Sequence, residues 1–417
     1  MLDRREAQNL DAADPLRALR RAFVIDDPEL IYLDGNSLGR LPKRTARVLR
    51  EAVRRQWGER LIRGWDDWID LPQRVGDQLA EAFLGARPGE VAVSDSTTVN
   101  FYKLASAALD ARPGRRVILT SDDNFPTDRY VLESLAASRG MELRPLKADP
   151  GEGLGLARLR GALGPDVALV SLSHVNYRSG ALEDMAAITA AAHKAGALAL
   201  WDLCHSVGAV PIDLEGTGAD LAVGCTYKYL SAGPGAPAFL YVRRALQDEL
   251  RQPIWGWFGQ RDQFEMGPRY EPTPGIGHFL AGTPTVFGVL AIQAGVEVLA
   301  EVGIEPLRAK AVALGEYLIQ LWEVWLRPLG FELGSPRDAK RRGAHVALRH
   351  PDAYRICQAL IAEARVLPDF RTPDAIRLGP APAYTRFVDV WDALDRMRDL
   401  VASGAHERFA PSLARVT

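Results

Sequence analysis

Short apolar runs alternate with helical stretches through the middle of this chain, and this alternation constrains the fold more than any other feature. Seven runs are typical of strands, near residues 90–94, 116–120, 141–145, 167–172, 197–201, 221–225 and 237–242. The stretches between and after them predict helices, near residues 98–109, 127–138, 155–162, 183–194 and 243–249. Such alternation favours an α/β fold, in which helices cover both faces of a mostly parallel sheet.

The flanking regions carry other patterns. Residues 13–24 predict a helix, residues 31–33 a short strand, and residues 43–85 a further helical stretch. Periodicity stops between residues 251 and 285, a segment too long for a routine connection and therefore expected to be a functional loop. Residues 284–326 predict one long or broken helix that bridges two domains.

The length of 417 residues exceeds what one hydrophobic core comfortably supports. We expect a large cofactor-binding domain at residues 51–290, a linking helix at 291–327 and a smaller α+β domain at 328–417. The N-terminal segment, residues 1–50, is expected to pack with the small domain.

Composition narrows the class of protein. The net charge of −2 gives no electrostatic reason to expect nucleic acid or anionic lipid as a partner. The three cysteines, Cys204, Cys225 and Cys357, form no CxxC pair, so neither a disulfide framework nor a metal site is indicated. No apolar run approaches the roughly 18 to 20 residues of a membrane span, and the N-terminus lacks the apolar core of a signal peptide. We therefore expect a cytoplasmic protein that acts on a small molecule.

Two neighbouring strands are each followed by a residue that carries chemistry. Asp202 ends the expected strand at 197–201, and Tyr227 and Lys228 follow the strand at 221–225. Ligands of open α/β sheets bind beyond the carboxyl ends of the strands, so the acid and the amine should face one crevice. This pair suits pyridoxal 5'-phosphate, whose aldehyde forms a Schiff base with lysine and whose ring nitrogen pairs with an acid. A buried Asp–Lys salt bridge is the alternative interpretation.

Other strand ends carry compatible side chains. Thr97 and Thr98 begin a helix, where free N–H groups and hydroxyls bind phosphate, although simple N-capping would explain them too. Phe125 could stack on a planar ring or only fill space. Ser173 ends another strand, and His205, three residues after Asp202, lies near enough to reach the cofactor.

Together these segments resemble the kynureninases, which are fold-type I pyridoxal phosphate enzymes related to the class V aminotransferases. Tyr-Lys-Tyr at 227–229 is shared widely, whereas Asp-Gly-Asn-Ser-Leu-Gly at 34–39 and Gly-Trp-Phe-Gly at 256–259 are more specific. The resemblance covers residues 30–390, and its segments are Tyr32–Gly39, Phe125–Asp128, Ser173–Tyr177, Trp201–Asp202, Tyr227–Tyr229, Gly256–Gly259, Phe264–Met266 and Phe279–Pro284.

The resemblance implies a seven-stranded large-domain sheet and a role for each matching residue. Lys228 would form the imine and move protons, and Asp202 would pair with the ring nitrogen. Either Tyr227, through the cofactor phosphate, or Lys228 would protonate the β-carbon. The cofactor would be held by Thr97, Thr98, Phe125, Asp128, Ser173, Asp202, His205, Tyr227 and Lys228. Trp257 and Thr283 would reach the cofactor phosphate from the partner subunit of a homodimer. Arg377 would clamp the substrate carboxylate, with Ser37 and Trp65 beside the substrate.

The implied reaction is hydrolysis of the Cβ–Cγ bond of L-kynurenine to anthranilate and L-alanine, in tryptophan catabolism and on the route to NAD biosynthesis. Some family members also convert 3-hydroxykynurenine to 3-hydroxyanthranilate. Residues 63–68 lack a histidine that some members carry, and Thr283 stands where some have asparagine. These departures favour kynurenine as the substrate.

Four other functions compete with this one. Gly35–Gly39 matches the G-x-S-x-G pattern of serine hydrolases, but Pro42 follows too soon for the helix that such an elbow needs. A cysteine desulfurase or an aminotransferase would share the fold, but a desulfurase needs a cysteine on a mobile loop. A non-catalytic scaffold should have lost the lysine or the acid, and both are present.

Overall fold

The seven expected strands form a single sheet in the computed structural model, which describes residues 3–410. The strand order is β2-β8-β7-β6-β5-β3-β4, and β8 alone runs antiparallel to its neighbours. Each strand begins and ends within one or two residues of its predicted position, and all except β4 are short, mainly apolar runs. The strands are β2 (Val91–Ser94), β3 (Val117–Ser121), β4 (Glu142–Leu146), β5 (Val167–Ser173), β6 (Leu198–Asp202), β7 (Leu221–Gly224) and β8 (Ala238–Val242).

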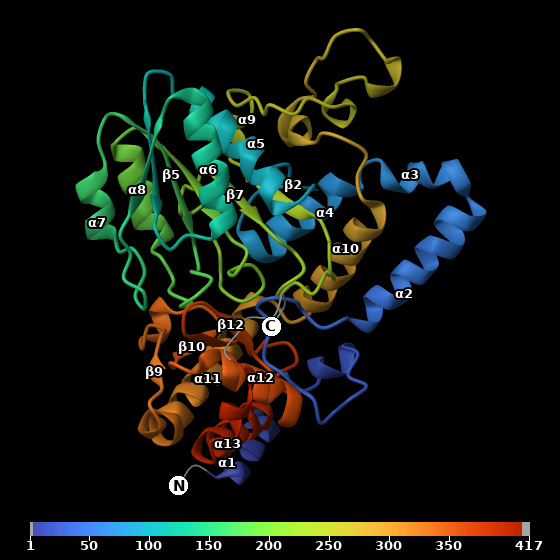
Figure 1. Cartoon of the computed structure of the whole chain (residues 1–417). Coiled ribbons are helices and arrows are strands. Elements are labelled where there is room, and N and C mark those ends of the chain that lie inside the picture. The colour runs from blue at the N-terminus through green and yellow to red at the C-terminus, as the bar shows by residue number, and fades with distance from the viewer. Residues whose placement is uncertain (1–2, 411–417) are drawn as a thin grey trace.

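Helices cover both faces of this sheet, as predicted (Figure 1). Side chains on β3 alternate between the faces: Ile118 packs in one core with α5 (Thr97–Asp110) and α6 (Pro126–Arg139), whereas Val117 and Leu119 belong to the other. The second core includes side chains from α4 (Leu71–Leu79), α7 (Leu156–Ala162), α8 (Met185–Lys194) and α10 (Val286–Ala300). Burial on both faces explains why the other strands are almost uniformly apolar, whereas the edge strand β4 carries Glu142 and Arg144 and is not buried.

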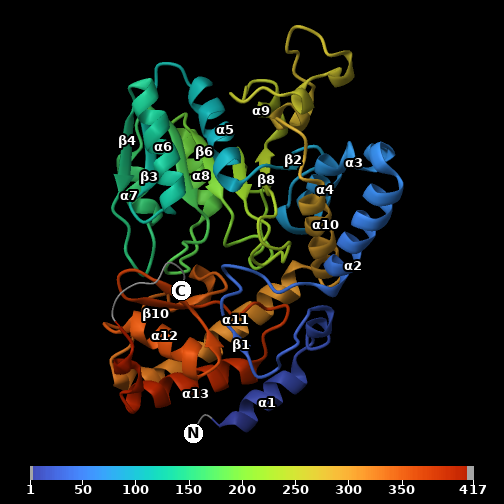
Figure 2. The ribbon, with the colours of Figure 1, turned by 45° about the vertical axis from the view of Figure 1, so that its right-hand side comes forward.

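The C-terminal part has its own core beneath a four-stranded antiparallel sheet of order β12-β13-β10-β9. Its strands and helices are β9 (Glu332–Leu333), β10 (Val346–Arg349), β12 (Asp369–Arg371), β13 (Ala375–Leu378), α11 (Ile304–Leu321), α12 (Ala353–Glu363) and α13 (Phe387–Ala402). The N-terminal helix α1 (Arg4–Ala13) lies against α13, and β1 (Ile31–Tyr32) pairs with β11 (Val366–Leu367) (Figure 2). We therefore propose the four-part division given above, of which residues 1–2 and 411–417 lie outside the described range.

The helix expected at residues 13–24 is wrong. The helix lies earlier, at Arg4–Ala13 with Asp3 as its N-cap, and only a 3₁₀ turn forms at Leu19–Ala22. Asp14 ends the helix because its side chain accepts from the Leu16 N–H and pairs with Lys310 Nζ at 2.7 Å. Pro15 directly after it disfavours helical backbone at Asp14.

The remaining helical regions are more broken than their patterns indicate. Residues 43–84 form α2 (Lys43–Glu51), a π-helical segment at Ala52–Glu59, a 3₁₀ turn at Leu61–Gly64, α3 (Trp65–Trp68), α4 and a second π-helical segment at Ala80–Leu84. After the short helix α9 (Arg244–Gln247), the loop at 251–285 holds only the 3₁₀ turns η5 (Trp257–Gly259), η6 (Gln263–Glu265) and η7 (Gly275–Phe279), and it projects from the large domain (Figure 1).

The predicted bridging helix breaks between α10 and α11, where Gly303 adopts φ 77°. Within residues 3–410 no single helix is long and apolar enough to cross a bilayer, although Val286–Ala300 and Ile304–Leu329, bent by 79°, reach that length together.

Candidate active site

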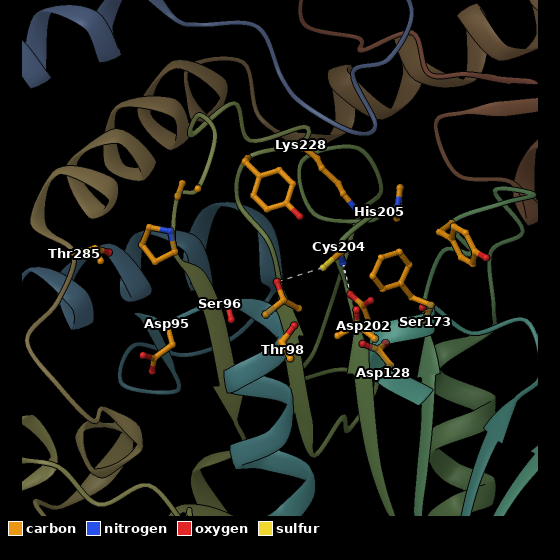
Figure 3. A pocket seen from close by; sticks show the side chains of 18 residues that line it. Asp95, Ser96, Thr98, Asp128, Ser173, Asp202, Cys204, His205, Lys228 and Thr285 are labelled. Carbon is orange, nitrogen blue, oxygen red and sulfur yellow. Dashed lines mark hydrogen bonds between the residues drawn. The ribbon is translucent and has the colours of Figure 1, made fainter. Parts of the chain in front are cut away.

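A cavity of about 530 Å³ lies at the carboxyl end of the large sheet, as Asp202 and Lys228 predict (Figure 3). Its volume is in the usual range for small-molecule sites. The residues that line it come from the turn before α5, the start of α6 and the ends of β5, β6 and β7. The predicted site residues among them are Thr97, Thr98, Phe125, Asp128, Ser173, Asp202, His205, Tyr227 and Lys228.

Lys228 points toward His205 across this cavity, with its Nζ 2.8 Å from His205 Nε2 (Figure 3). His205 is buried. Burial, and to a smaller extent the charge of Lys228, holds the pKa of His205 well below its usual value. The imidazole is therefore neutral, and its Nε2 can accept a hydrogen bond from the lysine.

Two carboxyl groups meet at the end of β6. Asp202 is held in place by the Cys204 N–H, which donates to its Oδ1 at 2.7 Å. Asp128, in the first turn of α6, is 2% exposed, and burial together with the nearby charge of Asp202 raises its pKa well above the usual range. Asp128 thus keeps its proton and can donate it in a hydrogen bond to Asp202, so one charge is shared by two acids.

The N-terminus of α5 offers donors for an anion. Ser96 caps the helix by accepting from the Val99 N–H at 3.3 Å, and Thr97 and Thr98 in the first turn line the cavity. Asp95, just before the cap, adopts a positive φ of 46° and is held by Lys103 Nζ at 2.5 Å. Helix N-termini that present free N–H groups bind phosphate readily.

Lys103 is a structural part of this site that sequence reasoning missed. It is buried, and besides Asp95 it donates to the carbonyl of Phe279 at 2.9 Å, tying the α5 turn to the loop at 251–285. The available signal was a single lysine within the apolar face of α5, where a charged group needs a buried partner.

Phe125 and Ser173 frame the cavity on the side of β5. The Phe125 ring is 38% exposed and meets Tyr177 edge to face at 5.3 Å, which leaves a ring face toward the cavity. Ser173 Oγ donates to Asn124 Oδ1 at 2.7 Å, and Asn124 Nδ2 donates to Thr120 Oγ1 at 3.1 Å. Asn124 is thus a second supporting residue that the sequence did not single out.

Arg377 lies outside this cavity lining, buried among groups that orient its guanidinium. Its Nε donates to Asp369 Oδ2 at 2.6 Å and its Nη2 to the same oxygen. Further bonds run to Ser37 Oγ at 3.0 Å and to the carbonyl of Tyr177. Asp369, eight residues before Arg377, is the partner that sequence reasoning missed, although an acid on the paired strand was its available signal.

Besides Arg377 and Ser37, three predicted site residues lie outside the lining of this cavity in their own chain. Trp257 contacts Phe258 and Phe264 in the projecting loop, and Thr283 is exposed. Trp65 packs against Trp68 and Phe258, at ring distances of 5.7 and 6.0 Å. Thr285, which was not predicted, lines the cavity instead.

The cysteines are not arranged as a mobile nucleophile. All three are buried, and the Cys225 N–H donates to Cys204 Sγ at 3.1 Å. The neighbouring Cys225 thiol and burial raise the pKa of Cys204 well above its usual value, so this thiol stays protonated. Neither Cys204 nor Cys225 can serve as the loop cysteine that a desulfurase requires.

The side chains present fit pyridoxal phosphate. Lys228 is the one lysine that lines the cavity within residues 3–410, which makes it the Schiff-base candidate. Asp128 Oδ2 is buried without a hydrogen-bond partner in the same range, beside the Asp202 carboxylate that a ring nitrogen requires. The α5 N-terminus suits the phosphate and the Phe125 face suits the ring.

Family models match most of the chain. The class-V aminotransferase model covers residues 74–349, and the kynureninase C-terminal domain model covers residues 307–397.

Curated relatives match nearly the whole length. A kynureninase of Burkholderia pseudomallei is 44% identical over 413 residues, 97% of each chain. A kynureninase of Pseudomonas fluorescens is 44% identical over 409 residues, 96% of each chain.

Solved structures share the fold at lower identity. A cysteine desulfurase of Thermococcus onnurineus has a TM-score of 0.81 at 19% identity, covering 93% of this chain and 98% of its own. A C-DES mutant with glycine covalently linked to its PLP cofactor has a TM-score of 0.76 at 20% identity, covering 96% of this chain and all of its own. These two likenesses support the fold alone, whereas the full-length relatives carry the family. The chain belongs to the kynureninase family, on a fold-type I, class-V aminotransferase architecture.

Proposed function

We propose that this enzyme binds pyridoxal 5'-phosphate and hydrolyses the Cβ–Cγ bond of L-kynurenine, giving anthranilate and L-alanine in tryptophan catabolism. The observation that carries the proposal is the meeting of Lys228, Asp202 and the N-terminus of α5 in one cavity, in a chain with full-length kynureninase relatives. A scaffold protein would have no reason to keep this set of groups together.

The residues that hold the cofactor follow from their positions. Lys228 forms the covalent link, Asp202 pairs with the ring nitrogen, and Asp128 supports Asp202 through its retained proton. Thr97 and Thr98 take the phosphate, while Ser173 and His205 border the ring beside Phe125. When bound, pyridoxal phosphate withdraws electrons from the substrate carbons attached through its imine, which makes their C–H and C–C bonds easier to break.

Proton transfer falls to side chains around Lys228. Lys228 takes and returns protons at the substrate α-carbon, and His205 Nε2, 2.8 Å away, accepts a hydrogen bond from its amine. Tyr227 lines the same cavity, and Cys225 and burial raise its pKa above the usual value. Its phenol therefore keeps the proton that the β-carbon needs once the aryl group has left.

Arg377 would recognise the substrate α-carboxylate, with Ser37 beside it. A guanidinium binds a carboxylate through two parallel N–H bonds, which fixes orientation as well as charge. Asp369 binds one edge of the Arg377 guanidinium. The opposite edge of the guanidinium is therefore oriented before the substrate binds. We assign kynurenine rather than 3-hydroxykynurenine as the preferred substrate, because residues 63–68 around Trp65 offer no histidine for the extra hydroxyl.

We propose a homodimer in the cytoplasm, with the active site shared between subunits. Exposed apolar side chains occur between α2 and α3, on the projecting loop and at the start of α10. They are Trp57, Leu61, Ile62, Trp255, Trp257, Phe264, Met266 and Phe287. The α2–α3 segment and the loop lie on the same side of the molecule (Figure 2). A face of this kind is usually covered by another protein, and a second copy would bring Trp257 and Thr283 to the partner's cavity.

The direct test of function follows the aryl ketone absorbance of kynurenine and of 3-hydroxykynurenine with the purified holoenzyme. We expect loss of the kynurenine chromophore with one anthranilate and one alanine formed per substrate, at higher kcat/KM than for the hydroxylated compound. Turnover that requires a keto acid and leaves the cofactor as an amine would indicate an aminotransferase instead.

Mixed dimers test the shared site. Lys228→Ala and Trp257→Ala chains are each expected to be inactive alone. After mixing and exchange they should regain about a quarter of wild-type activity, because half of the dimers are mixed and each carries one intact site. No regain in a mixture that does form hybrid dimers would place Trp257 in its own chain's site.

A further inference from the structure

His345 lies at the interface between the two domains, directly before β10. Its side chain is 0% exposed. A Cβ placed on Gly180 of the large domain would lie 2.8 Å from the His345 carbonyl oxygen and 3.3 Å from its Nε2, so the two residues are in close contact. The Gly343 N–H also donates to the Gly180 carbonyl at 2.7 Å. Local contacts thus hold the His345 backbone against the loop that follows β5.

The His345 ring faces the group that contacts Lys228. Its centroid is 5.4 Å from that of His205, and His205 Nε2 is 2.8 Å from Lys228 Nζ. Within residues 3–410, neither Nδ1 of His205 nor a ring nitrogen of His345 has a hydrogen-bond partner of normal geometry, although the Arg178 backbone lies close enough to the His345 ring to raise its pKa. Buried polar atoms nearly always find a partner, so these neighbouring nitrogens call for a common one.

Burial, together with nearby positive charges, keeps the two rings neutral. Burial lowers the pKa of both His205 and His345. Three nearby positive charges lower it further, those of Lys228, Arg377 and Arg371. A neutral imidazole has one N–H and one acceptor nitrogen. Because Nε2 of His205 accepts from Lys228, the proton of His205 is on Nδ1 and needs an acceptor. The described residues offer His345 as the neighbouring ring with a free nitrogen.

We propose that His345 is a positioning residue that accepts the Nδ1 proton of His205, directly or through one water, and so fixes the tautomer that presents Nε2 to Lys228. Ala347, two residues on, pairs across the sheet with Arg377. The small-domain strands that carry the carboxylate-binding arginine therefore also place the residue that orients the His205–Lys228 pair. The catalytic consequence rests on the proposed function, but the tautomer does not.

The test uses the full-length protein labelled with ¹⁵N-histidine, which has seven histidines to assign. Long-range ¹H–¹⁵N spectra report which ring nitrogen of His205 carries the proton. We expect Nδ1–H in the wild type and in His345→Gln, whose amide oxygen can also accept. In His345→Phe the His205 signals should shift toward a tautomer mixture. His345→Ala, which adds no bulk, gives the same readout if the phenylalanine variant does not fold.

Kinetics supply the second readout. His345→Phe should lower kcat about tenfold or more while KM for kynurenine stays within about twofold, and His345→Gln should recover most of the loss. His350→Phe, at the other end of β10, is the matched control and should change neither quantity. An unchanged His205 tautomer in His345→Phe, or an equal kcat loss in His350→Phe, would overturn the inference. Absence of kynurenine turnover in the wild type would refute the proposed function. The role of His345 in setting the His205 tautomer would then be tested by the spectra alone.

Discussion

The buried pair between Asp369 and Arg377 gives a prediction whose size follows from the structure. Both side chains are 1% exposed, and Asp369 Oδ2 accepts from two guanidinium nitrogens while its Oδ1 lies 2.8 Å from Arg371 Nη1. Asp369→Asn keeps the shape of the side chain and removes its charge. It thereby leaves the buried Arg377 without the carboxylate that pairs with it directly.

Breaking a buried ion pair by removing one partner typically costs about 3 to 5 kcal/mol, because the other charge stays buried. Arg377 keeps its bonds to the Tyr177 carbonyl and Ser37 Oγ, which places the expected loss near the lower value, about 3 kcal/mol. Asp374→Asn is the matched control: Asp374 pairs with the half-exposed Arg349 in the same domain, so its loss should cost only about 0 to 1 kcal/mol.

The assay is urea unfolding of the full-length variants followed by far-UV circular dichroism, with KM for kynurenine measured in parallel. Asp369→Asn should unfold at clearly lower urea than Asp374→Asn, and its KM should rise about tenfold as Arg377 loses its fixed orientation. Equal unfolding midpoints for the two variants would refute the claim that burial makes loss of the Asp369–Arg377 pair costly to stability. An unchanged KM would separate Asp369 from substrate recognition.

Three further changes test separate parts of the site. Arg377→Lys keeps the charge but loses the two-pronged geometry, so steady-state kinetics should show KM raised about tenfold or more with a smaller change in kcat, and an unchanged KM would remove Arg377 from the carboxylate role. Burial raises the pKa of Asp34 to about 6, so the folded state holds a proton that the unfolded state has released. The free energy of unfolding should therefore fall by up to about 3 kcal/mol as pH rises from about 4 to above 6, and Asp34→Asn should abolish this loss. The measurement is the urea midpoint of both proteins against pH, and parallel profiles would contradict the prediction. Tyr227→Phe should lower kcat at least tenfold with the cofactor still bound, and a normal rate would show that another group protonates the β-carbon.

The sequence predicted the features that depend on local patterns. The strands of the large sheet appeared as apolar runs, and Asp202, Ser173 and Lys228 could be placed at one edge because parallel strands end together. The helix at 13–24 failed because Asp14 bonds to its own backbone and to the distant Lys310, which no local pattern reveals.

Contacts between distant segments were beyond sequence reasoning for the same reason. Lys103 meets the Phe279 carbonyl 176 residues away, and Arg377 meets the Tyr177 carbonyl 200 residues away. His345 was not singled out in the sequence, because its contact with His205 forms only where the two domains meet. Residues that support a site from the neighbouring domain carry no period or spacing in the chain.

Borohydride reduction of the holoenzyme tests the central claim most directly, because it fixes the imine to whichever amine forms it. The chain has seven lysines, of which Lys103 is the informative competitor, since it is buried beside the same α5 turn. Peptide mapping should find the reduced pyridoxyl group on Lys228, with none bound to a folded Lys228→Ala variant. Label on Lys103 or any other lysine, or a wild-type protein that takes up no pyridoxal phosphate, would contradict the account.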